Sequence, residues 1–154
     1  GGLISWIGDI GRFETVSALW SYCGLAVHDG EIQKRKKGEK ANWNPNLKLL
    51  AWKAATSFVR VGKGYRELYL QSKEKYQQAH PEPMPYDPPR QKREGGELLK
   101  YTPGHIDNMA RRWVAKLFFS HAWETWRKLE GLPVRDPYVL EQMGHTSKIE
   151  VVME

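Results

Sequence analysis

At two places in the chain, a polar residue followed directly by proline precedes a stretch of apolar residues at helical spacing. Asn44-Pro45 precedes one stretch and Thr102-Pro103 precedes the other. Asparagine and threonine are favoured helix N-caps, and proline fits the first helical position because the amide that it lacks would have no partner there. The two pairs therefore predict the starts of two long helical segments, and they constrain the fold more than any other feature.

Apolar residues recur with the period of an α-helix after each of these pairs. In the first stretch the predicted buried positions are Leu47, Leu50, Ala51, Ala54 and Phe58. Gly62 and Gly64 interrupt this stretch, and the helical spacing resumes at Tyr65, Leu68, Tyr69 and Tyr76. In the second stretch, which Gly131 and Pro133 end, the predicted buried positions are Ile106, Met109, Trp113, Leu117, Phe118, Trp123, Trp126 and Leu129. We expect this second, aromatic helix to pack on the helix that begins at Pro45.

The opening of the chain predicts a helix, a tight turn and a second helix. Residues 3–7 complete a helix that ends at Gly8, and "GDIGRF" has the glycine content of a turn. Thr15 then fits the N-cap of a second helix, and Gly24 fits the left-handed position after its end. The arrangement resembles a helix-hairpin-helix, a motif whose turn amides approach a phosphate backbone.

Residues 25–41 predict a short β excursion or an ordered loop. Leu25-Ala26-Val27 is apolar, Asp29-Gly30 is typical of a hairpin turn, and Glu31-Ile32 can return as a strand. The fold class predicted for the chain is therefore mainly α. It begins like a helix-hairpin-helix, continues with this excursion, and ends with two long helical segments.

A proline-rich segment separates the two long helical segments. Residues 80–96 contain five of the nine prolines together with many charges, which is the composition of a linker or an extended arm. We place this linker within a helical domain of residues 1–133 and predict an irregular tail over residues 134–154. The chain opens within what reads as the second half of a helix, so we expect a piece of a longer protein.

Positive charge is concentrated in one segment. Lys34 to Lys63 contain nine Lys and Arg residues against Glu39 alone, a net charge of +8, whereas the whole chain carries +6, so the remaining residues sum to −2. A local excess of this size favours an anionic partner, of which nucleic acid is the commonest. The alternatives are a solvated basic face without a partner and a face that binds an acidic protein.

The densest part of this charge lies just before the helix that begins at Pro45. A helix start carries free amides and about half a positive charge, and both favour a phosphate. The basic run adds attraction at the same edge, where Trp43 can stack beside the anion. Contacts of this kind supply affinity rather than sequence reading. The predicted nucleic-acid-binding residues are Arg12, Lys34, Arg35, Lys36, Lys37, Lys40, Asn42, Asn44 and Lys48.

Other chemistry has little support in the sequence. The five histidines are dispersed, no Cys-x-x-Cys is present and the acidic residues do not cluster, so we predict no metal site in this chain. Ser120 beside His121 resembles a nucleophile and a base, but neighbours on a helix point in different directions. Cys23 is the single cysteine, which excludes an internal disulfide and favours a reducing compartment. No stretch reaches the ~18 apolar residues of a membrane span, so we expect a cytoplasmic protein.

Four motifs in order resemble a known family. They are "GDIGRF" at Gly8–Phe13, "LWSYCGL" at Leu19–Leu25, Asn-x-x-Leu-Lys at Asn44–Lys48, and Trp-x-x-Leu at Trp126–Leu129. The match is strengthened by "YTPGHI" at Tyr101–Ile106 and by "WRKLEGLPVRDPYV" at Trp126–Val139. The ordered set resembles the C-terminal domain of the IS-one-ten (IS-one-sixteen / IS-nine-oh-two) insertion-sequence transposases. The resemblance covers most of the 154 residues.

The resemblance implies a part of a prokaryotic DNA recombinase. The family joins an N-terminal RNase H-like domain, whose acidic residues bind divalent metal ions, to a helical domain of this type. Members act on DNA with a structured guide RNA, assemble as homo-oligomers, and use a serine of the C-terminal domain as nucleophile. These properties imply DNA and RNA as partners, no membrane, and a divalent metal held by the N-terminal domain rather than by this chain.

One position departs from the family pattern. Many relatives have Ser-Gly in the loop after the Gly-Leu motif, and that serine is the expected nucleophile, whereas this chain has Asp29-Gly30. Ser120 is the remaining candidate nucleophile, and we expect the chain alone to be inactive. The leading hypothesis is the nucleic-acid-binding domain of a transposase. The second is a stand-alone, non-catalytic helical module that binds DNA or RNA.

Overall fold

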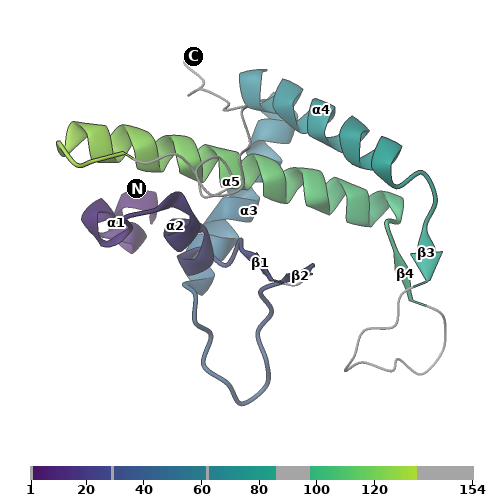
Figure 1. Ribbon diagram of the computed structural model, residues 1–154, viewed down its shortest axis with the longest axis horizontal. Coiled ribbons are helices and arrows are strands. Elements are labelled where there is room, and N and C mark those ends of the chain that lie inside the picture. Colours follow the sequence, from purple (N-terminus) through teal and green to yellow (C-terminus); the bar gives the residue numbers. More distant parts are fainter. Residues whose placement is uncertain (1, 29, 62, 86–97, 135–154) are drawn as a thin grey trace.

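The computed structural model describes residues 2–28, 30–61, 63–85 and 98–134 (Figure 1). The helices in these ranges are α1 (Gly2–Ile7), α2 (Val16–Tyr22), α3 (Pro45–Val61), α4 (Lys63–Ala79) and α5 (Pro103–Leu129), with a 3₁₀ turn at Ile10–Arg12. The only strands within them form two short antiparallel hairpins. The predicted mainly α class is therefore confirmed. None of these helices combines the length and the apolar character needed to cross a membrane.

The opening of the chain follows the predicted order of helix, turn and helix. α1 ends at Gly8, whose φ is +72°, and Asp9 caps the 3₁₀ turn by accepting a hydrogen bond from the Gly11 amide at 2.8 Å. The Thr15 hydroxyl caps α2 by accepting from the Ala18 amide at 3.2 Å. Gly24, with φ +70°, takes the left-handed position after α2.

The packing of these first helices differs from a helix-hairpin-helix. α1 packs mainly against α3, whereas α2 packs mainly against α5. Each helix therefore buries its apolar face on a different partner in the main bundle. The chain order of the motif is present, but the two helices do not form its self-contained hairpin.

Two hairpins flank the helices. β1 (Val27–His28) and β2 (Glu31–Ile32) pair as predicted, with His28 opposite Glu31. β3 (Met84–Pro85) pairs with β4 (Leu99–Lys100), a hairpin that the sequence did not predict. It pairs the beginning of the proline-rich segment with residues that follow that segment. The rest of the linker predicted at 80–96, and the tail at 134–154 apart from Val134, lie outside the described residues.

The caps predicted for the long helices are present. The Asn44 side chain accepts hydrogen bonds from the Asn46 and Leu47 amides at 2.9 and 3.2 Å, and the Thr102 hydroxyl accepts from the His105 amide at 3.3 Å. α5 spans the fold, with α4 along one side and α3 crossing it (Figure 1). α5 packs against α2, α3 and α4, so the predicted contact between the aromatic helix and the helix that begins at Pro45 is confirmed.

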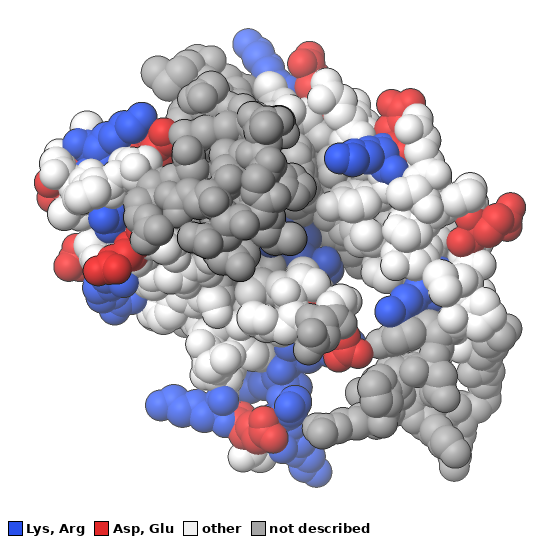
Figure 2. Space-filling model, viewed as in Figure 1, with Lys and Arg blue, Asp and Glu red and all other residues white. Residues whose placement is uncertain are grey.

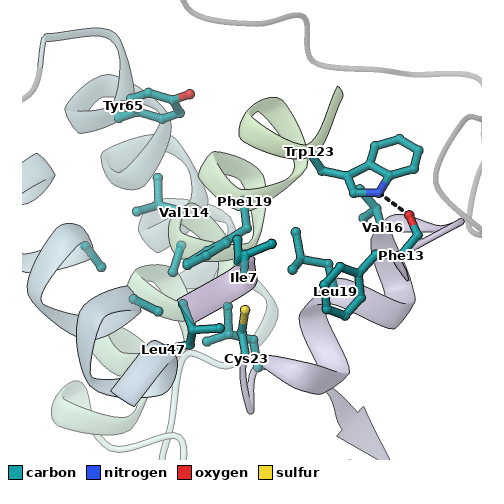
Figure 3. Close-up of a cluster of buried hydrophobic side chains, with 14 of the residues drawn as sticks. Ile7, Phe13, Val16, Leu19, Cys23, Leu47, Tyr65, Val114, Phe119 and Trp123 are labelled. Atoms are coloured by element: carbon teal, nitrogen blue, oxygen red, sulfur yellow. Dashed lines mark hydrogen bonds between the residues drawn. The ribbon is translucent and has the colours of Figure 1, made fainter. Parts of the chain in front are cut away.

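The core lies where α5 meets these neighbours (Figure 3). The largest fully buried side chains include Trp123 and Phe119 from α5, Leu19 from α2 and Leu47 from α3. The Trp123 indole N–H donates to the Phe13 carbonyl at 2.7 Å, which ties the opening of the chain to α5.

The predicted burial on α5 needs correction. Leu129, expected in the core, is 82% exposed because it is the last residue of the helix. Ala110, Val114 and Phe119 are buried although the sequence did not single them out. The reason is that α5 has neighbours on three sides, so its buried surface is wider than one stripe.

Candidate nucleic-acid interface

The basic loop, residues 34–42, has both of its ends fixed to the end of α2. At its start Gln33 is buried, and its side-chain amide donates to the Ser21 carbonyl at 3.2 Å and accepts from the Ala26 amide at 3.0 Å. After its end, the Asn44 amide donates to the Tyr22 carbonyl at 2.7 Å. Because Ser21 and Tyr22 are neighbours, the two ends of the loop lie close together, as in a compact surface loop.

Lys48 and Trp43 complete the base of the basic loop. The Lys48 ammonium donates to the Gln33 carbonyl at 2.6 Å and lies 5.1 Å from the centre of the Trp43 ring. Burial, and then the charge of Arg112, lower the pKa of Lys48. Trp43 and Lys48 also pack on Gly24 so closely that a Cβ there would lie 2.7 Å from the indole and 2.9 Å from the lysine chain. Glycine at this position therefore permits both a left-handed backbone and a close contact.

The basic loop itself projects away from the helices (Figure 1), and Figure 2 shows its blue side chains at the bottom of the same view. The exposed cations of the loop are Lys34, Arg35, Lys36, Lys37 and Lys40. Within the described ranges, the one ion pair that the loop makes joins Lys36 to Glu39 at 3.9 Å, with both side chains more than half exposed. Such a pair contributes little stability. The charge of the loop is therefore displayed to solvent on a framework with fixed ends.

A cavity of about 450 Å³ lies between the basic loop and the first hairpin. Three cations of the loop line it, Lys34, Lys36 and Lys40, together with the exposed Asn42 and the Trp43 ring. Glu31 and Glu39 also line it, so among the described lining residues the net charge is one positive unit. Arg35 and Lys37 are not part of this lining. The loop therefore offers cations both to the cavity and to the solvent around it.

The start of α3 does not contribute free amides to this surface, contrary to expectation. The amides of Asn46 and Leu47 already donate to the Asn44 side chain, and Pro45 has none. An anion at this edge would therefore meet side chains and the helix dipole rather than open backbone donors.

Arg12 and Asn44 meet at Tyr22. The Arg12 guanidinium lies 5.2 Å from the centre of the Tyr22 ring, and the Asn44 amide nitrogen lies 3.4 Å from the Tyr22 hydroxyl. Hydrogen bonds from Asn44 and then Arg12 lower the pKa of Tyr22. The structure therefore brings these two predicted residues together at Tyr22, beside the base of the basic loop. The turn that contains Arg12 offers few amides to a phosphate, since the Gly11 amide is taken by Asp9 and the Arg12 amide by the Asp9 carbonyl.

Ser120 is not brought to this surface. It is half-buried on α5 and is absent from the described linings of the cavities beside both hairpins. Its neighbour His121 is buried, with Nδ1 2.7 Å from the Tyr65 hydroxyl. That contact directs Nδ1 of His121 toward Tyr65 of α4. Asp29, at the position of the expected serine, lies outside the described residues.

Gln33 is the functional-site residue that the sequence did not reveal. The residues next to Gln33 in the sequence do not reveal that it is buried, because its partners are backbone groups of Ser21, in α2, and of Ala26, which follows α2. The only hint of its burial in the sequence is that Gln33 directly follows Ile32, the last apolar residue before the basic loop.

The described side chains of the basic loop are mainly exposed cations. In the described part of the chain, no three of the His, Cys, Asp and Glu side chains lie close enough together to share a metal ion. Comparison with protein-family models, with curated proteins and with solved structures finds no match for this chain.

Proposed function

We propose that this chain binds nucleic acid through the basic loop, as the C-terminal domain of an insertion-sequence transposase. The observation that carries the binding proposal is the basic loop itself, five exposed cations on a segment whose two ends are held at adjacent residues of α2. Cations on a framework with fixed ends lose less conformational freedom when they meet a phosphate backbone. Contacts of this kind provide affinity and positioning for DNA or structured RNA rather than sequence reading.

The transposase part of the proposal rests on the ordered motifs from "GDIGRF" to "WRKLEGLPVRDPYV". In this proposal the catalytic metal ions are held by a separate N-terminal domain, a guide RNA and a second copy take part, and the protein acts in the prokaryotic cytoplasm. Its test is the coding DNA upstream of Gly1. A strand-rich segment with spaced acidic residues in the same reading frame supports the assignment. A complete, unrelated gene in that upstream DNA contradicts the transposase assignment. The remaining hypothesis is then a stand-alone module that binds nucleic acid.

The binding proposal is tested by fluorescence anisotropy with a labelled DNA duplex at low salt. Gln replaces the four consecutive cations Lys34, Arg35, Lys36 and Lys37 in one variant. A matched control loses the same charge from the exposed positions Lys53, Arg60, Lys63 and Lys75. We expect the loop variant to lose at least about tenfold in affinity and the control to lose much less. If the loop variant and the control lose the same affinity for the duplex, the basic loop has no special role. If the parent chain binds polyglutamate as tightly as the duplex, the partner is an acidic protein instead.

A further inference from the structure

A second cavity, of about 310 Å³, lies on the other side of the first hairpin. Its walls come from α5, from the end of α4, from β4 and from the tip of the β1–β2 hairpin, which lies under α5 in Figure 1. The described residues that carry its polar and aromatic lining include Tyr76, Tyr101, His105, Arg112, Trp113 and Lys116. None of the described lining residues is an Asp or a Glu.

Two cations of this cavity lie half-buried, one helical turn apart on α5. Burial lowers the pKa of Arg112, and burial followed by the charge of Arg112 lowers the pKa of Lys116. The Lys116 ammonium lies 4.3 Å from the centre of the Trp20 ring. No hydrogen bond or ion pair joins the side chain of either residue to a carboxylate among the described residues.

Among the described residues, Lys48, His105 and Lys116 are the groups whose pKa values respond to the charge of Arg112, and each of them is positive when charged. Burial first, and then the charge of Arg112, lowers these three pKa values. Bringing like charges together in a half-buried site destabilises the folded chain. An anion bound between Arg112 and Lys116 would relieve that cost, and guanidinium groups match phosphate oxygens in geometry.

The aromatic wall of the cavity is held in a strained backbone conformation. Tyr101 has φ +57°, which is uncommon for a residue with a side chain. Its amide donates to His105 Nδ1 at 2.9 Å, and its ring stacks between His80 and His105, with centroids at 3.5 and 5.4 Å. The bond to Nδ1 places the imidazole proton of neutral His105 on Nε2, and burial, followed by the charge of Arg112, lowers the pKa of His105. Tyr76 and Trp113 complete this aromatic wall, and the same cavity is lined by Arg112 and Lys116.

We propose that this second cavity binds the phosphate group of a nucleotide, with Arg112 and Lys116 as its cationic partners and the base against the aromatic wall. Its volume lies at the lower end of the range for small-ligand pockets, which suits one nucleotide. A base has a π-face that can stack on Trp113 or Tyr76, and such stacking tolerates any sequence. The site is separate from the basic loop, so it does not depend on the loop's binding to a duplex.

Isothermal titration calorimetry with thymidine 5′-monophosphate and with thymidine tests this proposal on the whole chain. We expect the monophosphate to bind at least about tenfold more tightly than the nucleoside, because only it offers charge-assisted hydrogen bonds to Arg112 and Lys116. Arg112→Gln should remove that advantage. Arg66→Gln, the same change at an exposed position on α4, should preserve it. The variant lacking the four loop cations should also preserve it, which separates this site from the basic loop.

A thermal unfolding measurement without ligand tests whether Arg112 has a purely structural role. If its charge is uncompensated, Arg112→Gln should leave the Tm unchanged or raise it, whereas an arginine with a structural partner would lower the Tm when replaced. If a 5′-phosphorylated single strand binds more tightly than the monophosphate, the natural ligand of the cavity is the end of a strand. If the two bind equally, the natural ligand is a free nucleotide. Equal affinity for monophosphate and thymidine, or unchanged monophosphate binding by Arg112→Gln, overturns the proposal.

Discussion

The Lys48 ammonium donates a hydrogen bond to the Gln33 carbonyl at 2.6 Å and thereby connects the first turn of α3 to the start of the basic loop. Gln33 is buried and is itself held by the end of α2. A lysine predicted from the sequence to contact nucleic acid therefore also has a partner within the chain. In the proposed interface, its contribution would include the position that it gives to the loop.

Replacing Lys48 by Met tests this positioning role. Methionine keeps the aliphatic packing on Trp43 but removes the donor to the Gln33 carbonyl, so we expect a loss of about 1–2 kcal/mol in the free energy of unfolding. Urea denaturation measures this loss. Lys53→Met, the same change at an exposed position of α3, is the control and should change stability by less than about 0.5 kcal/mol. Equal effects at the two positions would show that the Lys48 bond does not stabilise the loop.

Alanine at Gly24 and at Gly38 separates backbone strain from steric overlap. Both glycines have positive φ, +70° and +80°, but a Cβ at Gly38 meets nothing within 4 Å. Gly38→Ala should therefore cost about 1 kcal/mol of stability from its backbone alone. Gly24→Ala should cost about 2–4 kcal/mol, because the methyl group also overlaps the Trp43 ring. Chemical denaturation of both variants gives the comparison, and equal losses would contradict the packing at the loop base.

Asp107 should make the stability of the chain depend on acidic pH. Burial opposes its charge, but hydrogen bonds from Tyr69 and Arg111 outweigh burial and lower the pKa of Asp107 in the folded chain. Lys73 adds a charge at 3.4 Å. Because the unfolded chain then binds the proton more readily, this stabilisation is present above the ordinary pKa, near 4, and is lost as the pH falls through the folded value.

The corresponding variant is Asp107→Asn. At pH 7 we expect it to be about 1–2 kcal/mol less stable than the parent chain in urea denaturation, since it loses charge-assisted hydrogen bonds at a half-buried site. The difference should shrink below about pH 4, where the parent carboxylate also loses its charge. A difference that stays constant between pH 7 and pH 3 would contradict this assignment.

Cys23 should not react with thiol reagents in the folded chain. Its side chain is completely buried, and burial raises the pKa of the thiol to about 12, so almost no thiolate is present at neutral pH. We expect one thiol to be labelled by iodoacetamide in denaturant and essentially none in native buffer at pH 8. Rapid labelling of the native chain would contradict the burial of Cys23 between α2 and the core.

The helix starts could be predicted from the sequence because capping is local. Thr15, Asn44 and Thr102 each accept hydrogen bonds from amides two or three residues further on, so residue types at short spacing were sufficient. The β1–β2 hairpin was predictable for the same reason, since its two paired strands are only two residues apart in the sequence.

The remaining features depend on contacts between distant parts of the chain. Three neighbouring helices, α2, α3 and α4, decide which side of α5 is buried. The apolar residues of α5 do not lie on one face, so the sequence alone does not show that side. The pairing of β3 with β4, and the convergence of Tyr76, Tyr101 and Arg112 on one cavity, join residues with no regular spacing. The excess charge of the basic loop was visible in the sequence, but its fixed ends were not, because they depend on the burial of Gln33.

The salt dependence of duplex binding tests most directly whether the basic loop binds the phosphate backbone. If the chain neutralises about six phosphates, the logarithm of its affinity should fall with the logarithm of the salt concentration with a slope of about −5. With Gln at Lys34, Arg35, Lys36 and Lys37, about two contacts remain, and the slope should flatten to about −2 while the circular dichroism spectrum is unchanged. A parent affinity that does not depend on salt, or the same steep slope in the variant, would contradict the account.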